Sequence, residues 1–304
     1  MLLQLTADQD QLRQSLRVLF DRQAGWERSR SLENDVDRPL LSSMQQAGFL
    51  DVASTEGGTL LDAVLVVEEA EAACARAPVA ARALVAARLL DSAPLVVGLV
   101  DTDPCALTRY AGLCDAYLVL DSGGASYAEA AQVDVTPEPS RWGYPLGRVR
   151  VRRAARLGSG TGGRLLAAWQ VALAAEMGAA MRRAVDLTAT YVTHRTQFGR
   201  PIGSYQAVSH ALSEAKVATE GTIWMARRAA ADPDDTILAA AAATYAADAA
   251  GLIVQRTHQV TGAIGITREY GLVASTMRLG VLRSELGGPR RHAIGLAELR
   301  WPQP

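Results

Sequence analysis

The chain has 304 residues, 49% of them hydrophobic and 21% charged, which suits a globular protein with a sizeable core. Its 31 basic and 32 acidic residues leave a formal net charge of −1, so nucleic acid is not expected as a partner. The three cysteines form no Cys-x-x-Cys pair and the four histidines lack metal-ligand spacing, which argues against a disulfide framework and a metal site.

Residues 1–92 predict a helical N-terminal domain. The stretch from Thr6 to Gln9 has the pattern of a capping box, and apolar residues follow it at helical spacing. A short amphipathic helix is expected over 39–47, and an apolar helix follows the glycine pair at 57–58. The opening sequence lacks the basic-then-apolar order of a signal peptide, so a cytoplasmic protein is expected.

Residues 93–157 predict a small β-domain. Apolar runs at 94–100 and 116–120 and the alternating run at 147–151 are typical of strands. Several arginines occur between Arg148 and Arg156. They could bind phosphates, although the solvated face of an edge strand is the simpler interpretation.

A glycine-rich stretch follows, in which Gly158, Gly160 and Gly163 have the spacing of a dinucleotide-binding fingerprint. That fingerprint requires an alternation of strands and helices after it, and only helical segments follow here. We therefore interpret the stretch as a flexible linker between domains.

Residues 158–304 predict a bundle of long helices separated by proline and glycine. Within it, residues 236–255 are almost free of charge and could be mistaken for a membrane span. Asp248 would then lie near the bilayer centre at a cost of several kcal/mol, so a helix buried among other helices is expected. The predicted helical segments are 164–195, 202–230, 235–260 and 268–286.

The most informative segment lies at the end of the first of these helices. Arg195 offers a planar, permanently charged fork that can pair with a phosphate, and Phe198 offers a ring that can lie against an aromatic system. Taken alone, the segment is more simply interpreted as ordinary helix termination at a Gly–Pro turn.

Two segments in register resemble the signatures of the acyl-CoA dehydrogenase family. The first matches Arg-x-Gln-Phe-Gly-x-Pro-Ile followed by a glutamine, and the second is similar to the family's Gln-x-x-Gly-Gly-x-Gly loop. The N-terminal region resembles the family's opening domain less specifically, so the resemblance extends over nearly the whole chain. The matching residues are Arg195, Gln197, Phe198, Gly199, Gln206, Gln259, Gly262 and Gly265.

The resemblance implies a mainly α fold with an N-terminal helical domain, a small abbreviated β-domain and a C-terminal four-helix bundle. It also implies FAD as the cofactor, bound at a subunit interface, and oxidation of the α–β bond of an acyl-CoA thioester. Arg195 would then neutralise the pyrophosphate, and Gln197, Phe198, Gly199 and Gln206 would line the adenosine side. The second loop, from Gln259 to Gly265, would allow close approach of the backbone.

The sequence departs from the family where the reaction takes place. Neither the family's Thr-Glu-Pro loop nor its tryptophan-containing strand, which clasp the flavin ring, is found between Leu95 and Arg156. The catalytic glutamate is replaced by Leu286 or Gly287 at one of the family's sites and by Trp169 or Gln170 at the other. None of these side chains can accept a proton from carbon.

Glu285 is the one candidate for a catalytic base, because a shift of one or two residues would bring it to the expected position. Glu176 lies on the same predicted helix as Trp169 and is interpreted as structural.

These features resemble the short, non-catalytic subunit of heteromeric actinobacterial dehydrogenases that degrade steroid side chains. A full-length partner in an α2β2 assembly would then supply the glutamate, the flavin-ring pocket and the acyl-CoA site. An electron-transferring flavoprotein is the acceptor that the family implies, and no membrane is involved. The alternatives are a self-sufficient homomeric dehydrogenase that uses Glu285 and a cofactor-free scaffold that reuses the fold.

Overall fold

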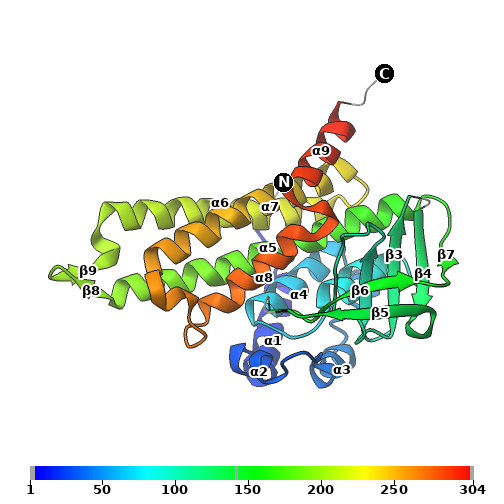
Figure 1. Cartoon of the computed structure of the whole chain (residues 1–304), viewed down its shortest axis with the longest axis horizontal. Helices are drawn as coiled ribbons and strands as arrows, with labels where there is room; N and C mark the ends of the chain where they lie inside the picture. Colours follow the sequence, from blue (N-terminus) through cyan, green and yellow to red (C-terminus); the bar gives the residue numbers. More distant parts are fainter. Residues whose placement is uncertain (1–3, 123, 141–142, 302–304) are drawn as a thin grey trace.

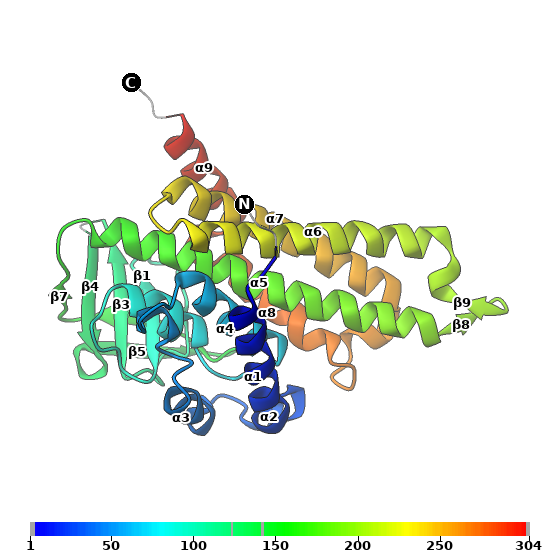
Figure 2. The same cartoon turned by 180° about the vertical axis from the view of Figure 1, so that it is seen from behind.

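A computed structural model describes residues 4–122, 124–140 and 143–301 of the chain. Long helices run along the molecule, the strands gather at one end, and a small hairpin projects from the other end (Figure 1). The shorter N-terminal helices cover one side of the long helices (Figure 2). This arrangement confirms the predicted mainly α fold.

The N-terminal helices begin where the sequence places caps. The predicted capping box is present, because the Thr6 side chain accepts a hydrogen bond from the Gln9 backbone and the Gln9 side chain accepts one from the Thr6 backbone. A second capping box joins Thr59 and Asp62. The helices are α1 (Ala7–Gln23), α2 (Trp26–Ser31), α3 (Arg38–Gln46) and α4 (Leu60–Ala72), followed by the π-helix η2 (Ala80–Val85) and the 3₁₀ helix η3 (Ala86–Arg88).

The strands form two small sheets. In the first, the parallel pair β1 and β3 is extended by the antiparallel strands β4 and β7, and in the second β6 lies between β2 and β5. The bounds are β1 (Val97–Asp101), β2 (Thr108–Arg109), β3 (Ala116–Asp121), β4 (Gly124–Glu129), β5 (Val133–Glu138), β6 (Leu146–Val151) and β7 (Ala155–Arg156). All three predicted strands are therefore present.

The arginine run lies on a solvated strand face, as the sequence indicates. Strand β6 pairs with β5 along its whole length but with β2 only at Leu146 and Gly147, so its arginines have one neighbouring strand, and they pair with acids of β5. Arg148 contacts Glu138 at 2.9 Å and Arg150 contacts Asp134 at 2.6 Å. Pairing across the strands neutralises charges that would otherwise be available to phosphates.

The glycine-rich stretch is a packed turn and not a flexible linker. The Thr161 hydroxyl donates to the Gly158 carbonyl, and a Cβ atom at Gly162 would come within 2.7 Å of the Gly124 backbone. The turn therefore fixes the start of α5 against β4.

The four predicted long helices are present with ends shifted by a few residues. Helix α7 is long and apolar enough to cross a membrane by length and composition, but it packs against α5, α6 and α8 within the bundle. An additional helix, α9, was not predicted because Gly287 and Pro289 signal a stop. Pro289 instead occupies the first turn, where a missing N–H costs nothing. The helices are α5 (Thr161–His194), α6 (Gln206–Ala231), α7 (Thr236–Thr261), α8 (Leu272–Ser284) and α9 (Gly288–Arg300).

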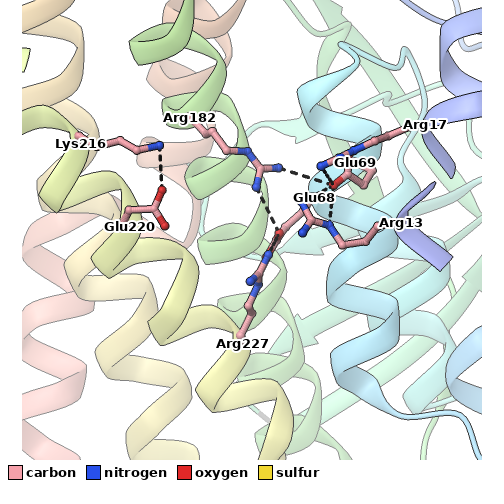
Figure 3. Close-up of polar contacts among 8 residues, drawn as sticks. All are labelled: Arg13, Arg17, Glu68, Glu69, Arg182, Lys216, Glu220 and Arg227. Atoms are coloured by element: carbon pink, nitrogen blue, oxygen red, sulfur yellow. Dashed lines mark hydrogen bonds and ion pairs between the residues drawn. The ribbon is translucent and has the colours of Figure 1, made fainter. Parts of the chain in front are cut away.

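A buried ion-pair network fastens the N-terminal helices to the bundle (Figure 3). On α4, Glu68 receives two hydrogen bonds from Arg227 of α6, at 2.8 and 2.6 Å. The adjacent Glu69 accepts hydrogen bonds from Arg13 and Arg17 of α1 at 2.8 and 2.9 Å. Because both carboxylates are buried, each needs these partners to offset the cost of leaving water.

The Glu69 pairs make stability depend on pH. Burial alone would raise the pKa of the Glu69 carboxyl, but hydrogen bonds from Arg17 and Arg13 outweigh it and lower the pKa below 4.5. A carboxyl with a lowered folded-state pKa contributes stability above its unfolded pKa and loses it as the pH falls through the folded pKa. We expect Glu69→Gln to lower the free energy of unfolding at pH 7 by about 2 kcal/mol.

Urea denaturation at pH 7 and at acidic pH measures this effect, and the difference between the wild type and Glu69→Gln should shrink in acid. Glu220→Gln is the matched control, because Glu220 pairs with Lys216 at an exposed site and should change stability by less than about 0.5 kcal/mol. A loss for Glu69→Gln that is the same at every pH would contradict the assignment.

Candidate functional site

The first predicted motif forms a hairpin at the free end of the bundle. Strands β8 (Thr196–Gln197) and β9 (Arg200–Pro201) are joined by Phe198 and Gly199, both with positive φ angles of 52° and 81°. Such a turn holds the strands close together and points its first side chain outward. The Phe198 ring is accordingly 92% exposed.

Tyr205 contacts three residues of this hairpin and holds it in place. Its hydroxyl donates to the Gln197 carbonyl at 3.3 Å, the Arg200 guanidinium lies 4.1 Å from its ring centroid, and the Phe198 ring meets it edge-on at 6.5 Å. The hairpin is therefore a supported platform rather than a loose loop.

Four polar side chains of the two motifs have no polar partner in the part of the chain that the structure describes. Arg195, Gln197, Gln206 and Gln259 make no side-chain hydrogen bond or ion pair with any residue that the structure describes. An Arg fork and amide groups left free at a molecular edge offer donors to an external anion.

The second predicted motif lies at the same end of the bundle, in the connection η6 (Gly262–Ile266) between α7 and α8 (Figure 1). Gly262 has a φ of 61° and open space where a Cβ would be, so its backbone is accessible. Gly265 is buried, and a Cβ there would come within 2.0 Å of the Thr261 hydroxyl. Its glycine is therefore required by the packing of the loop itself.

Glu285, the candidate base, lies far from this end and is fully engaged. The Arg109 Nε donates to one of its oxygens, and the indole Nε1 of Trp169 donates to the other at 2.8 Å. The remaining Arg109 nitrogens donate to both oxygens of Glu176 at 2.8 and 2.9 Å. Burial raises the pKa of the Glu285 carboxyl.

A second pair extends this arrangement. Arg278 donates to Glu71 at 2.9 Å and to the carbonyls of Cys74 and Ala75, and the Tyr144 hydroxyl donates to the same Glu71 oxygen at 3.1 Å. Two guanidinium groups thus face three carboxylates in the interior. We call this set the central charge cluster, and its members are Glu71, Arg109, Glu176, Arg278 and Glu285.

The central charge cluster leaves no room for a substrate. Two cavities border it, one lined by Arg109, Glu176 and Glu285 and the other by Glu71 and Glu176, and each holds about 10 Å³. That volume fits roughly one water molecule. Within the described ranges, neither cavity could admit the chain of an acyl thioester next to Glu285.

In the sequence, the only sign of this cluster is Glu71, which follows Glu68 and Glu69 in the apolar second half of α4. Arg109 and Arg278, which hold the cluster together, cannot be recognised from the sequence, because their partners lie 67 to 207 residues away. The interpretation of Glu176 as structural agrees with its place in the cluster.

Comparison with known proteins connects both motifs to one family. Residues 164–290 match the acyl-CoA dehydrogenase C-terminal domain. The acyl-CoA dehydrogenase IpdE2 of Mycobacterium tuberculosis is 32% identical over 82% of this chain and 80% of that protein. The acyl-CoA dehydrogenase FadE34 of the same organism is 30% identical over 84% of this chain, which spans 41% of the length of FadE34.

Solved structures share the fold. The ChsE4–ChsE5 complex from Mycobacterium tuberculosis matches with a TM-score of 0.86 and 20% identity over the full length of both chains. The Tcur3481–Tcur3483 steroid ACAD matches with a TM-score of 0.83 and 22% identity over 96% of this chain and 97% of that chain. The FAD complex of PigA matches with a TM-score of 0.81 and 16% identity over 99% of each chain. At the level of the family, FAD is therefore confirmed as the cofactor.

The central charge cluster predicts unequal effects of two substitutions. Arg109→Met would leave Glu176 and Glu285 buried without their cation and should lower the free energy of unfolding by about 3–5 kcal/mol. Glu285→Gln keeps an acceptor for Trp169 and leaves the Arg109–Glu176 fork intact, so it should cost at most about 2 kcal/mol. Guanidinium denaturation measures both, and an Arg109→Met loss no greater than that of Glu285→Gln would contradict this role.

Proposed function

The chain belongs to the acyl-CoA dehydrogenase family, and we propose that it is the short, non-catalytic subunit of a heteromeric FAD-dependent member. In this proposal it completes the ADP half of an FAD site, while a full-length partner subunit supplies the catalytic glutamate, the flavin-ring pocket and the acyl-CoA site. The assembly is an α2β2 heterotetramer in the cytoplasm, and an electron-transferring flavoprotein accepts its electrons.

One contrast within the molecule carries this proposal. At the hairpin end, Arg195 and three glutamine side chains are free and face outward. At the position of the candidate base, Glu285 is enclosed by Arg109 and Trp169 without space for a substrate. A chain with free donors for a cofactor but no space beside its candidate base fits an enzyme in which a second subunit carries the catalytic site.

The free side chains fit the ADP portion of FAD. The Arg195 fork can pair with the pyrophosphate, the amides of Gln197, Gln206 and Gln259 can bind adenosine, and the Phe198 ring can lie against the adenine. When bound, FAD supplies the hydride acceptor of the reaction. This chain's part is to hold one end of the cofactor and exclude water from it.

The relatives support the heteromeric assembly and the substrate class. ChsE4–ChsE5 is a complex of two different chains, and Tcur3481–Tcur3483 is a steroid ACAD with a paired name. We therefore propose an acyl-CoA ester of a steroid side chain as the substrate class, bound in the partner subunit and desaturated between its α and β carbons.

The decisive test is the FAD content of the complex co-purified with its full-length partner. Arg195→Ala removes the proposed pyrophosphate contact and should weaken FAD binding about tenfold or more, since charge-assisted hydrogen bonds contribute most of such recognition. Flavin absorbance per complex measures occupancy. Arg148→Ala, an exposed arginine on β6, is the matched control, and unchanged occupancy in Arg195→Ala would favour the cofactor-free scaffold.

Glu285→Gln separates the proposal from a self-sufficient enzyme. The complex carrying Glu285→Gln should keep its dehydrogenase rate with acyl-CoA, because the base belongs to the partner, and this chain expressed alone should be colourless. A yellow protein that is bleached by acyl-CoA, and loses that activity in Glu285→Gln, would establish the homomeric dehydrogenase instead.

A further inference from the structure

The two motifs of the proposed cofactor site are far apart in the sequence, and one face of α5 brings them together. Residues spaced four apart lie one above another on a helix. Arg183, Leu187 and Tyr191 have this spacing on α5, and Arg195 continues it at the C-cap. The Arg195 backbone N–H donates to the Tyr191 carbonyl at 2.9 Å, so the residue with the free guanidinium is fixed to the turn that begins at Tyr191. We call these four residues the α5 ridge.

The segment that follows the second motif lies along the α5 ridge. The Tyr270 hydroxyl donates to the Leu187 carbonyl at 2.6 Å, and the centroids of the Tyr270 and Tyr191 rings are 5.8 Å apart. One turn earlier on α5, Arg183 donates to the Gly271 carbonyl at 2.8 Å. The connection between α7 and α8 is therefore attached to the part of α5 that leads to the hairpin (Figure 1).

The loop of the second motif has little packing of its own. Of the five residues of η6, all of which the structure describes, only Gly265 is buried, and Ile264 and Ile266 are 36% and 68% exposed. A segment with so little buried apolar surface is kept in place mainly by its flanks. Of the hydrogen bonds that join this segment to α5 within the described ranges, the one from Tyr270 is the nearest to the loop.

We propose that Tyr270 is a positioning residue of the cofactor site, which sets the separation between Arg195 and the accessible backbone at Gly262. The inference rests on the proposed function, in which both motifs bind the ADP half of one FAD. A ligand that bridges two anchors binds tightly when their separation is fixed beforehand, because ordering a mobile anchor costs entropy. The Leu187 carbonyl already receives the Tyr270 hydroxyl, so Tyr270 acts through the loop and not on the cofactor itself.

The test is the FAD affinity of the complex with the full-length partner, measured by titrating FAD into the flavin-depleted complex and following flavin fluorescence. Tyr270→Phe removes only the hydroxyl and should weaken FAD binding about fivefold, the scale set by one hydrogen bond. Tyr270→Leu also removes the ring contact with Tyr191 and should weaken FAD binding further. Tyr127→Phe is the matched control, because Tyr127 lies on β4 among the strands at the other end of the molecule, and it should leave the affinity unchanged.

A double-mutant cycle with Arg195→Ala separates positioning from a general effect on the fold. If Tyr270 sets the separation of two anchors, its hydroxyl matters only while both anchors are present. Tyr270→Phe should therefore weaken FAD binding about fivefold in the wild-type background and less than about twofold in the Arg195→Ala background. A loss by the same factor in both backgrounds would indicate a purely structural role and overturn the inference.

The outcomes also separate this inference from the proposed function on which it rests. If Arg195→Ala weakens FAD binding while Tyr270→Phe and Tyr270→Leu leave it unchanged, the inference is overturned and the proposed function stands. If Arg195→Ala has no effect, the proposed function fails and the inference fails with it. Circular dichroism and urea denaturation confirm that each variant is folded under the conditions of the titration.

Discussion

The fork of Arg109 between Glu176 and Glu285 is the interaction on which the remaining structure depends. Arg109 belongs to a two-residue strand, Glu176 to the longest helix, and Glu285 to the turn before the last helix. Glu176 and Glu285 are buried and the Arg109 side chain is only 11% exposed, so loss of the arginine would leave two buried carboxylates unpaired at a penalty of several kcal/mol. The strands and the bundle are therefore held at one relative position. Through Arg278, the same cluster reaches Glu71 and fixes the N-terminal helices as well.

The cluster also explains the backbone around Glu285. Leu286 has a φ of 53°, a conformation that costs a residue other than glycine about 1–2 kcal/mol. This turn directs the Glu285 side chain inward to Arg109 and Trp169, and the two glycines that follow start α9 in a new direction. A carboxylate that could serve as a base thus becomes an internal tie between elements. Under the proposed function, the same geometry withdraws Glu285 from catalysis and uses it to stabilise the fold.

The alanine-rich helices impose a second constraint. Because alanine side chains are small, α5, α6 and α7 can approach one another closely, and each helix buries a series of alanines in the contact. At both ends of the bundle, apolar side chains such as Phe198 and Trp301 then remain exposed to solvent. Under the proposed function, the hairpin end meets a cofactor held by another subunit. In that case, this surface forms a complete binding site only together with the other subunit.

The sequence by itself determined most of the helices, the cap at Thr6, three of the strands and the resemblance to the family. Periodicity, capping boxes and turn residues act over a few neighbouring residues, so they can be read along the chain. Only the tertiary structure decided that a last helix, α9, follows the glycines and that Glu285 is held by Arg109 and Trp169. Arg109 and Glu285 are 176 residues apart, and nothing local indicates that they meet. Burial of a charge is settled by what surrounds it in space, and only the folded chain brings those surroundings together.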